Sequence, residues 1–337
     1  MRYRLLVAVG ASAAVVSGAL VATARLEAQS FGAKGTTTAA AKAARTPDGQ
    51  PDLQGVWTFA TVTPLERPKE FAGKEFLTEQ EAAAFEKLSA RDVDQREESS
   101  LGTAADVGAA YNQFWWDRGT KVVGTRRSSL IVDPADGKLP PISAEGQKRA
   151  ERAARRVNPP AGPEDRSLWE RCITHSPIPR MSTGYNNNLQ IFQGPGYVAI
   201  MYEMIHEVRI IPLDARPHVA QGVRQWLGDA RGHWEGNTLI VETTNFNGKA
   251  SFRGASENLR LVERFSRLDA DTLDYQFTVE DPSTWTRPWT AAVPMPRVGN
   301  IMYEYACHEG NYGLVGQLSG ARAEEKAAAE TAKNDSR

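Results

Sequence analysis

The chain has 337 residues, of which 41% are hydrophobic and 24% are charged, and its formal net charge is −1. This composition is ordinary for a soluble globular protein, and the length suits one large or two smaller domains. The balanced charge gives no basic surface of the kind that binds nucleic acid, so we expect neither nucleic acid nor a polyphosphate as a partner.

The N-terminus has the pattern of a secretory signal peptide. A positive start precedes an apolar, small-residue-rich run from Leu5 to Val21, and Ala22-Thr23-Ala24 offers a cleavage site, with a cut near Ala28 as the alternative. We predict a signal peptide at residues 1–28, a flexible leader at 29–50, and a periplasmic or secreted mature protein with no stable membrane insertion. An uncleaved anchor is the other reading, because the apolar run is about long enough to span a bilayer.

The next part of the chain is expected to combine one strand with short helices. Asp52 to Phe59 predicts the first strand. Thr78-Glu-Gln-Glu81 is a capping-box pattern that predicts a short helix, Ser143 begins a second helix that extends to Arg156, and Glu164 to Ile173 predicts a third. Between these elements we expect a mobile loop, an aromatic cluster, a strand and a turn, at about 91–108, 111–116, 121–132 and 133–137.

From Asn188 onward the pattern is that of strands joined by short turns. Gly236-Asn237 lies between two extended runs and predicts a tight hairpin, after which Leu239 and Val241 face a core and Glu242 faces water or a polar cavity. Further strands are expected at 189–193, 197–202, 206–213, 223–227, 233–235, 260–268, 272–280, 289–293 and 301–307.

A meander of this kind usually closes into a barrel, which removes exposed strand edges. We therefore predict a mainly β protein, in which an antiparallel meander closes into a barrel-like core with a few N-terminal helices. It forms a single domain over residues 51–318, followed by a helical or disordered tail at 319–337.

Cys172 and Cys307 are the only cysteines. An even count in an exported chain predicts a disulfide, and closing so long a loop contributes roughly 4–5 kcal/mol in the chain-entropy model. Two buried free thiols are the alternative. No Cys-x-x-Cys occurs, so neither a redox motif nor a zinc knuckle is predicted.

Polar residues that could carry chemistry interrupt the later strands. A histidine near a carboxylate can act as general acid or base near neutral pH, an arginine can hold a substrate anion, and a carboxylate can orient a histidine. We expect His206 or His308 to act as the acid or base, Arg209 to bind the anion and Glu309 to orient a histidine. The four side chains are expected to converge on one pocket. The alternative is a solvated polar face with structural histidines. The expected ligand-binding residues are Tyr202, Glu203, Trp234, Asn245, Tyr303 and Asn311.

No cofactor and no metal are predicted. The nucleotide-binding, zinc-protease, serine-hydrolase and EF-hand motifs do not occur. His206-Glu207 and His308-Glu309 look alike, but neighbours on a strand point to opposite faces, so each pair would supply one ligand. A metal site formed by both histidines and a carboxylate stays open, although the spacing does not require it.

Several segments resemble a group of uncharacterised exported bacterial proteins, over most of the chain after residue 50; this resemblance implies no catalytic residues. The segments are 165–172, 203–206, 226–229, 234–246 and 307–312. More distantly, Gly55-Val56-Trp57 and the meander are similar to calycins and lipocalins, which implies a calycin-type barrel.

Two functions follow from this reading. The chain binds a small, partly apolar molecule in the mouth of the barrel, or it is an acid–base enzyme, such as a hydratase, isomerase or hydrolase, that uses the His, Glu and Arg side chains there. An envelope-associated scaffold is a third reading, and the sequence leaves the oligomeric state open.

Overall fold

The computed structural model describes residues 44–91, 117–154, 157–175, 178–249, 252–299 and 301–335. The predicted signal peptide, most of the predicted leader, nearly all of the loop expected at 91–108 and the aromatic cluster at 111–116 lie outside the described residues. None of the helices that the structure describes is long and apolar enough to cross a membrane.

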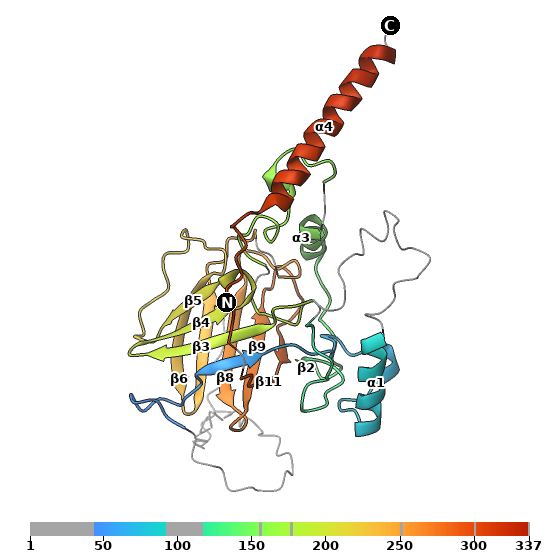
Figure 1. Cartoon of the computed structure of the whole chain (residues 1–337). Coiled ribbons are helices and arrows are strands. Elements are labelled where there is room, and N and C mark those ends of the chain that lie inside the picture. The colour runs from blue at the N-terminus through green and yellow to red at the C-terminus, as the bar shows by residue number, and fades with distance from the viewer. Residues whose placement is uncertain are drawn as a thin grey trace, which may run out of the picture. The chain divides into compact units, whose positions relative to one another are not determined.

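Antiparallel β-structure dominates the described residues, as predicted (Figure 1). One sheet has four strands in the order β1-β3-β4-β5, and the other has seven, in the order β2-β10-β9-β8-β7-β6 with β11 paired to β9. The strands are β1 (Gly55–Thr58), β2 (Ile131–Asp133), β3 (Asn188–Gly194), β4 (Tyr197–Tyr202), β5 (Val208–Pro212), β6 (Asp229–Glu235), β7 (Thr238–Thr244), β8 (Arg260–Arg267), β9 (Thr272–Glu280), β10 (Trp289–Ala292) and β11 (Met295–Pro296). The helices are α1 (Glu79–Arg91), α3 (Ala144–Ala154) and α4 (Tyr312–Asp335), with 3-10 turns η1 (Lys69–Phe71), η4 (Pro163–Asp165) and η5 (Met204–His206).

The predicted closed barrel is not found among these residues. The two sheets approach each other at β5 and β6 without a ladder, and a Cβ on Gly232 would lie 2.8 Å from side-chain atoms of Ile211 and Leu213. At β1, the opposite edge of the four-stranded sheet, an isolated β-bridge pairs Trp57 with Arg297, which follows β11. Alternating strands satisfy two packed sheets as well as a barrel, so the pattern did not decide between them.

The core lies between the two sheets and is rich in aromatic side chains. Trp57, Phe265, Phe277 and Trp289 are its largest fully buried members. Arg267 and Arg297 place their guanidinium groups over the Trp57 ring, 4.5 and 4.6 Å from its centroid. The aromatic residues therefore serve packing and cation–π contacts at this end of the core.

The local signals at the two predicted helix starts are confirmed. Thr78 Oγ1 accepts a hydrogen bond from the Glu81 N–H at 3.2 Å, and the Glu81 carboxylate accepts one from the Thr78 N–H at 2.9 Å. Ser143 Oγ accepts a hydrogen bond from the Gly146 N–H at 3.0 Å. The tight hairpin is also confirmed, because Glu235 pairs with Thr238 across the predicted turn.

Four predicted elements differ from the structure. Only residues 131–133 of the strand expected at 121–132 lie in a strand, the helix expected at 164–173 shrinks to η4 and a following turn, and 223–227 is a turn. The segment 301–307 has no regular secondary structure and pairs with no strand of the described chain, and Ile301 and Tyr303 are 78% and 81% exposed. Its apolar residues looked like strand residues, but a strand forms only where a neighbouring edge is free and the side chains find a core.

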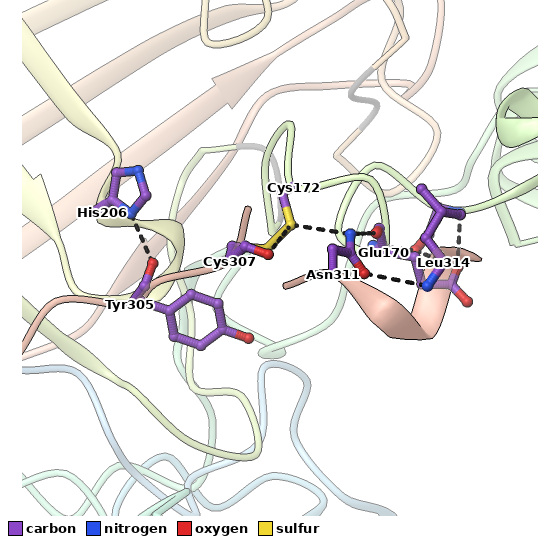
Figure 2. Close-up of a disulfide and its surroundings, with 8 residues drawn as sticks. Glu170, Cys172, His206, Tyr305, Cys307, Asn311 and Leu314 are labelled. Carbon is purple, nitrogen blue, oxygen red and sulfur yellow. Dashed lines mark hydrogen bonds between the residues drawn. A yellow bond between two sulfur atoms is a disulfide. The ribbon is translucent and has the colours of Figure 1, made fainter. Parts of the chain in front are cut away.

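The disulfide is confirmed. Cys172 and Cys307 are bonded, with their Cα atoms 5.7 Å apart (Figure 2). The bond ties the segment before β3 to the segment before α4, which has no regular secondary structure. It is consistent with an exported protein, because disulfides persist in oxidising compartments.

Candidate functional site

Arg209 does not share a pocket with the two histidines, contrary to the sequence-based expectation. It lies on the inner face of β5 and is 5% exposed. Its Nη1 and Nη2 donate hydrogen bonds to Oε1 and Oε2 of Glu263 on β8, at 3.0 and 2.6 Å. Glu263 is 0% exposed, so a fully buried, bidentate ion pair joins the two sheets.

Three hydroxyl groups complete this ion pair. Tyr275 Oη donates to Glu263 Oε1 at 2.9 Å, while Nη1 and Nη2 of Arg209 donate to Tyr202 Oη and Thr243 Oγ1, both at 3.1 Å. Burial alone would lower the pKa of Arg209, but the charge of Glu263 raises it, and burial raises the pKa of both tyrosines. At neutral pH the arginine stays charged and the tyrosines stay neutral. The expected anion-binding role of Arg209 is therefore replaced by a structural one.

His206 and His308 do come together. Their ring centroids lie 6.5 Å apart, and both residues are exposed. Figure 2 shows the His206 ring pointing at the main chain of Tyr305, where its Nδ1 lies 2.8 Å from the carbonyl oxygen. His206 is the last residue of the turn η5, and His308 directly follows Cys307 of the disulfide.

A cavity of about 470 Å³ lies beside the disulfide. Glu309 and Asn311 line it, together with Trp169 and Tyr305. Asn311 has a structural role here, because its Oδ1 accepts the Leu314 N–H at the start of α4 and its Nδ2 donates to the Glu170 carbonyl. The two histidines are not among the residues that line this cavity.

The other predicted ligand-binding residues are dispersed. Glu203 accepts hydrogen bonds from Asn188 at the start of β3. The Asn245 carboxamide donates to the carbonyl oxygens of Val219, Ala220 and Val223, and so holds the loop before β6. Trp234 packs against the core, and Tyr303 is exposed. Tyr202 lines neither the cavity beside the disulfide nor the cleft described next, but it belongs to a small pocket that adjoins that cleft.

A cleft of about 450 Å³ opens at the end of the four-stranded sheet, where β1 ends and β3 begins. We call it the end cleft. Arg118 and Arg253 are its two charged residues, and no carboxylate belongs to its described lining. The lining consists of Thr61, Val62, Thr63, Pro64, Leu65, Ser89, Arg118, Leu130, Met181, Ser182, Thr183, Gly184 and Arg253.

An inner pocket of only about 10 Å³, room for about one water molecule, adjoins the end cleft, since Met181 and Thr183 line both. Arg180 and Tyr202 form one side of this inner pocket, with the guanidinium 4.8 Å from the centre of the tyrosine ring. Arg180 is also ion-paired with Glu207. The other polar residues of the lining are His175, Thr183 and Asn186.

His175 is uncharged at neutral pH. Burial, and secondly the positive charge of Arg180, lowers its pKa from the ordinary 6.5 to about 4. Its ring packs edge-on against Trp169, with the two ring centroids 5.3 Å apart. The inner pocket therefore presents a neutral imidazole beside a buried cation.

Little in the amino-acid sequence indicates the end cleft. Most of its residues come from loops after β1, before β2 and before β3, which have no apolar periodicity to interpret, while Ser89 comes from α1 and Arg253 from the loop before β8. Polar loop residues held by a rigid sheet are common in binding sites. The run Arg180-Met-Ser-Thr-Gly184, directly before the first long strand, is the one feature that could have pointed here.

No group of three or more His, Cys, Asp and Glu side chains in the described part of the chain is placed to hold a metal ion. Comparisons with models of protein families, with curated proteins and with solved structures find no match to this chain. The family resemblance stated above therefore stays a prediction, and the argument for function rests on the geometry of the clefts.

Replacing Arg209 by Leu should lower the free energy of unfolding by about 3–5 kcal/mol, because Glu263 would remain buried without its partner. Urea denaturation measures the loss. The matched control is Arg287→Leu, which removes an exposed ion pair with Asp133 and should cost no more than about 1 kcal/mol. Equal losses in the two variants would contradict the role assigned to the buried pair.

The low pKa of His175 predicts a pH dependence of stability. Between pH 6.5 and 4 the unfolded chain binds a proton on His175 that the folded chain does not, so stability falls as the pH falls. From pH 7 to pH 5, wild type should lose about 1–2 kcal/mol more than His175→Asn. Urea denaturation at both pH values tests this, and an identical pH dependence in the two proteins would refute it.

Proposed function

We propose that this chain is a binding protein whose ligand is a small, partly apolar organic anion held in the end cleft. The observation that carries the proposal is the lining. Two arginines and several hydroxyl groups stand beside Leu65, Leu130 and Met181, without a carboxylate among the described lining residues. A volume of about 450 Å³ falls within the usual range of small-molecule sites, about 300–1,000 Å³.

The arginines can serve a ligand in the positions where they lie. Arg118 Nη2 donates to the carbonyl of Ser89 at 2.9 Å, and a guanidinium has further N–H donors that can reach an anion. Its main chain is held from the other side, because the Ser182 hydroxyl donates to the Arg118 carbonyl at 2.9 Å. Arg118 is therefore anchored at the cleft before a ligand arrives, which lowers the entropic cost of binding.

The apolar side of the cleft continues into the inner pocket through Met181. Phe59 and Met204 line that pocket, but its volume of about 10 Å³ holds no more than about one water molecule, so the ligand itself lies in the end cleft. A ligand with a hydrophobic body and one anionic group would place the body along Leu65, Leu130 and Met181 and its charge near Arg118 or Arg253. This supports the partly apolar character of the ligand expected from the sequence.

The acid–base enzyme is the second candidate. Its support is His175, a neutral imidazole beside Arg180 in the inner pocket. An imidazole with a pKa of about 4 is a weak base, since effective general bases have pKa values near the working pH. Binding is therefore the function that the geometry favours.

The ligand class predicts a charge-dependent difference between two fluorescent probes. We expect the anion 8-anilinonaphthalene-1-sulfonate to bind wild type. The double variant Arg118→Ala/Arg253→Ala should bind this probe at least about tenfold more weakly, because a hydrogen bond to a charged group contributes about 1.5–3 kcal/mol. The neutral N-phenyl-1-naphthylamine, of nearly the same shape, should lose much less. Fluorescence titration measures both.

The control for this pair of probes is Arg287→Ala, at an exposed arginine outside the end cleft. It should leave both titrations unchanged. Equal losses for the anionic and neutral probes in the Arg118/Arg253 variant, or an equal loss in the control, would refute anion recognition by the end cleft.

We also propose that the chain is exported and that its first residues, to about residue 28, are removed. The signal-peptide pattern and the Cys172–Cys307 disulfide support this. N-terminal sequencing of protein from the native host should therefore begin after the apolar run Leu5–Val21. Mature protein that still begins at Met1 would contradict cleavage.

A further inference from the structure

The structure brings together two histidines from distant parts of the chain. His206 ends η5, and His308 follows the disulfided Cys307. Their ring centroids are 6.5 Å apart, and both residues are exposed. Neither ring is needed for the core, so the pair can serve a ligand from solvent.

The hydrogen bond of His206 prepares the ring to act as a metal ligand. Its Nδ1 lies 2.8 Å from the carbonyl oxygen of Tyr305. A carbonyl only accepts, so Nδ1 carries the proton in the neutral ring and the lone pair is on Nε2. Metal-binding histidines almost always donate their second N–H to a carbonyl or carboxylate in this manner.

The main chain holds both histidines in place. Ile205 and His206 have φ values of 59° and 45°, a left-handed conformation that costs energy in residues other than glycine and is often found at functional sites. The Cys172–Cys307 bond fixes the residue next to His308. The pair is therefore preorganised by a strained turn on one side and by a covalent bond on the other.

The spacing fits one shared ion. Metal–nitrogen distances of about 2.0–2.1 Å place two imidazole centroids about 5–6.5 Å apart, depending on the angle at the metal. The observed 6.5 Å is at the upper end of this range, which corresponds to two imidazoles on nearly opposite sides of the ion. Glu304 and Glu309 flank His308 in sequence and line the neighbouring cavity, so the surroundings favour a cation.

The other three of the five histidines have competing contacts. His175 lies beside the cation Arg180. Both ring nitrogens of His218 lie near carboxylates, at 2.9 and 3.5 Å, and His233 Nε2 lies 3.3 Å from Glu235. Only His206 and His308 present a pair of rings to each other.

We propose that His206 and His308 bind one divalent transition-metal ion, with water completing its coordination. Imidazole ligands suit Cu²⁺, Ni²⁺ and Zn²⁺, and the usual order of affinity makes Cu²⁺ the tightest of these. Two protein ligands leave positions open, in contrast to the closed shell of a structural zinc site. This site is separate from the end cleft and does not depend on the proposed anion binding.

The test is a calorimetric titration of the tag-free, disulfide-bonded chain with Cu²⁺ and with Zn²⁺. Wild type should bind one equivalent of either ion, with Cu²⁺ the tighter. His206→Ala and His308→Ala should each weaken binding by at least about tenfold, while the matched controls His218→Ala and His233→Ala leave it unchanged. A loss confined to one of the two proposed ligands, or an equal loss in a control, would overturn the shared site.

A measurement on wild type keeps the proposal testable if a variant folds poorly. In ¹⁵N-edited spectra of the histidine rings, substoichiometric Cu²⁺ should broaden the signals of His206 and His308 together, because both rings contact the paramagnetic ion. Broadening of only one of them, or of His233 first, would overturn the proposal.

Discussion

The ion pair between Arg209 and Glu263 is the constraint on which the arrangement of the two sheets depends. Each charge is buried between the layers, where neither is tolerated alone. The bidentate geometry fixes β5 over β8, and the hydroxyl groups of Tyr202 and Tyr275 hold it from both sheets. A shift of either layer would separate the charges, so the packing of the sheets is specified by this contact as well as by the hydrophobic core.

The same cluster extends to the end of the sheet. Tyr202 receives a hydrogen bond from Arg209 on one side and carries the Arg180 guanidinium over its ring on the other. Arg180 in turn keeps His175 neutral by its charge, in addition to burial. The polar wall of the inner pocket is therefore a continuation of the buried cluster, which explains how a polar pocket persists beside an apolar core.

The cavity beside the disulfide and the end cleft differ in the charge of the residues that line them. Glu170, Glu304 and Glu309 line the cavity beside the disulfide, whereas the end cleft has Arg118 and Arg253 and no carboxylate in its described lining. A cation and an anion would therefore be drawn to different places on the molecule. This division underlies the assignment of an anionic ligand to the end cleft and of a metal ion to the histidines beside the disulfide.

Local signals in the sequence predicted local structure well. The hairpin at Gly236-Asn237, the caps at Thr78 and Ser143, and the disulfide follow from short-range chemistry and from the cysteine count. The role of Arg209 could not be predicted, because a charged residue on a strand has the same pattern whether it faces a cavity or a buried partner. Its partner Glu263 lies on another sheet and can be identified only from the fold.

The expected strand at 301–307 failed for a related reason, since β-propensity does not say whether a neighbouring edge is free. The end cleft was missed because loops form it, and loops have no periodicity from which a shared surface could be inferred. His206 and His308 were expected to meet, and they do, but on the surface and without Arg209.

The proposed binding function is tested most directly by locating the site at which a partly apolar anion binds. In a chain with ¹³C-labelled methionine methyl groups, 8-anilinonaphthalene-1-sulfonate should shift the signal of Met181, which lines the end cleft. Met201 should stay unchanged, because it alternates with inward-facing Tyr202 on β4 and so lies on the other face of the sheet. A shift of Met201 with Met181 unperturbed would place the ligand on the outer face of the sheet and contradict the proposed site.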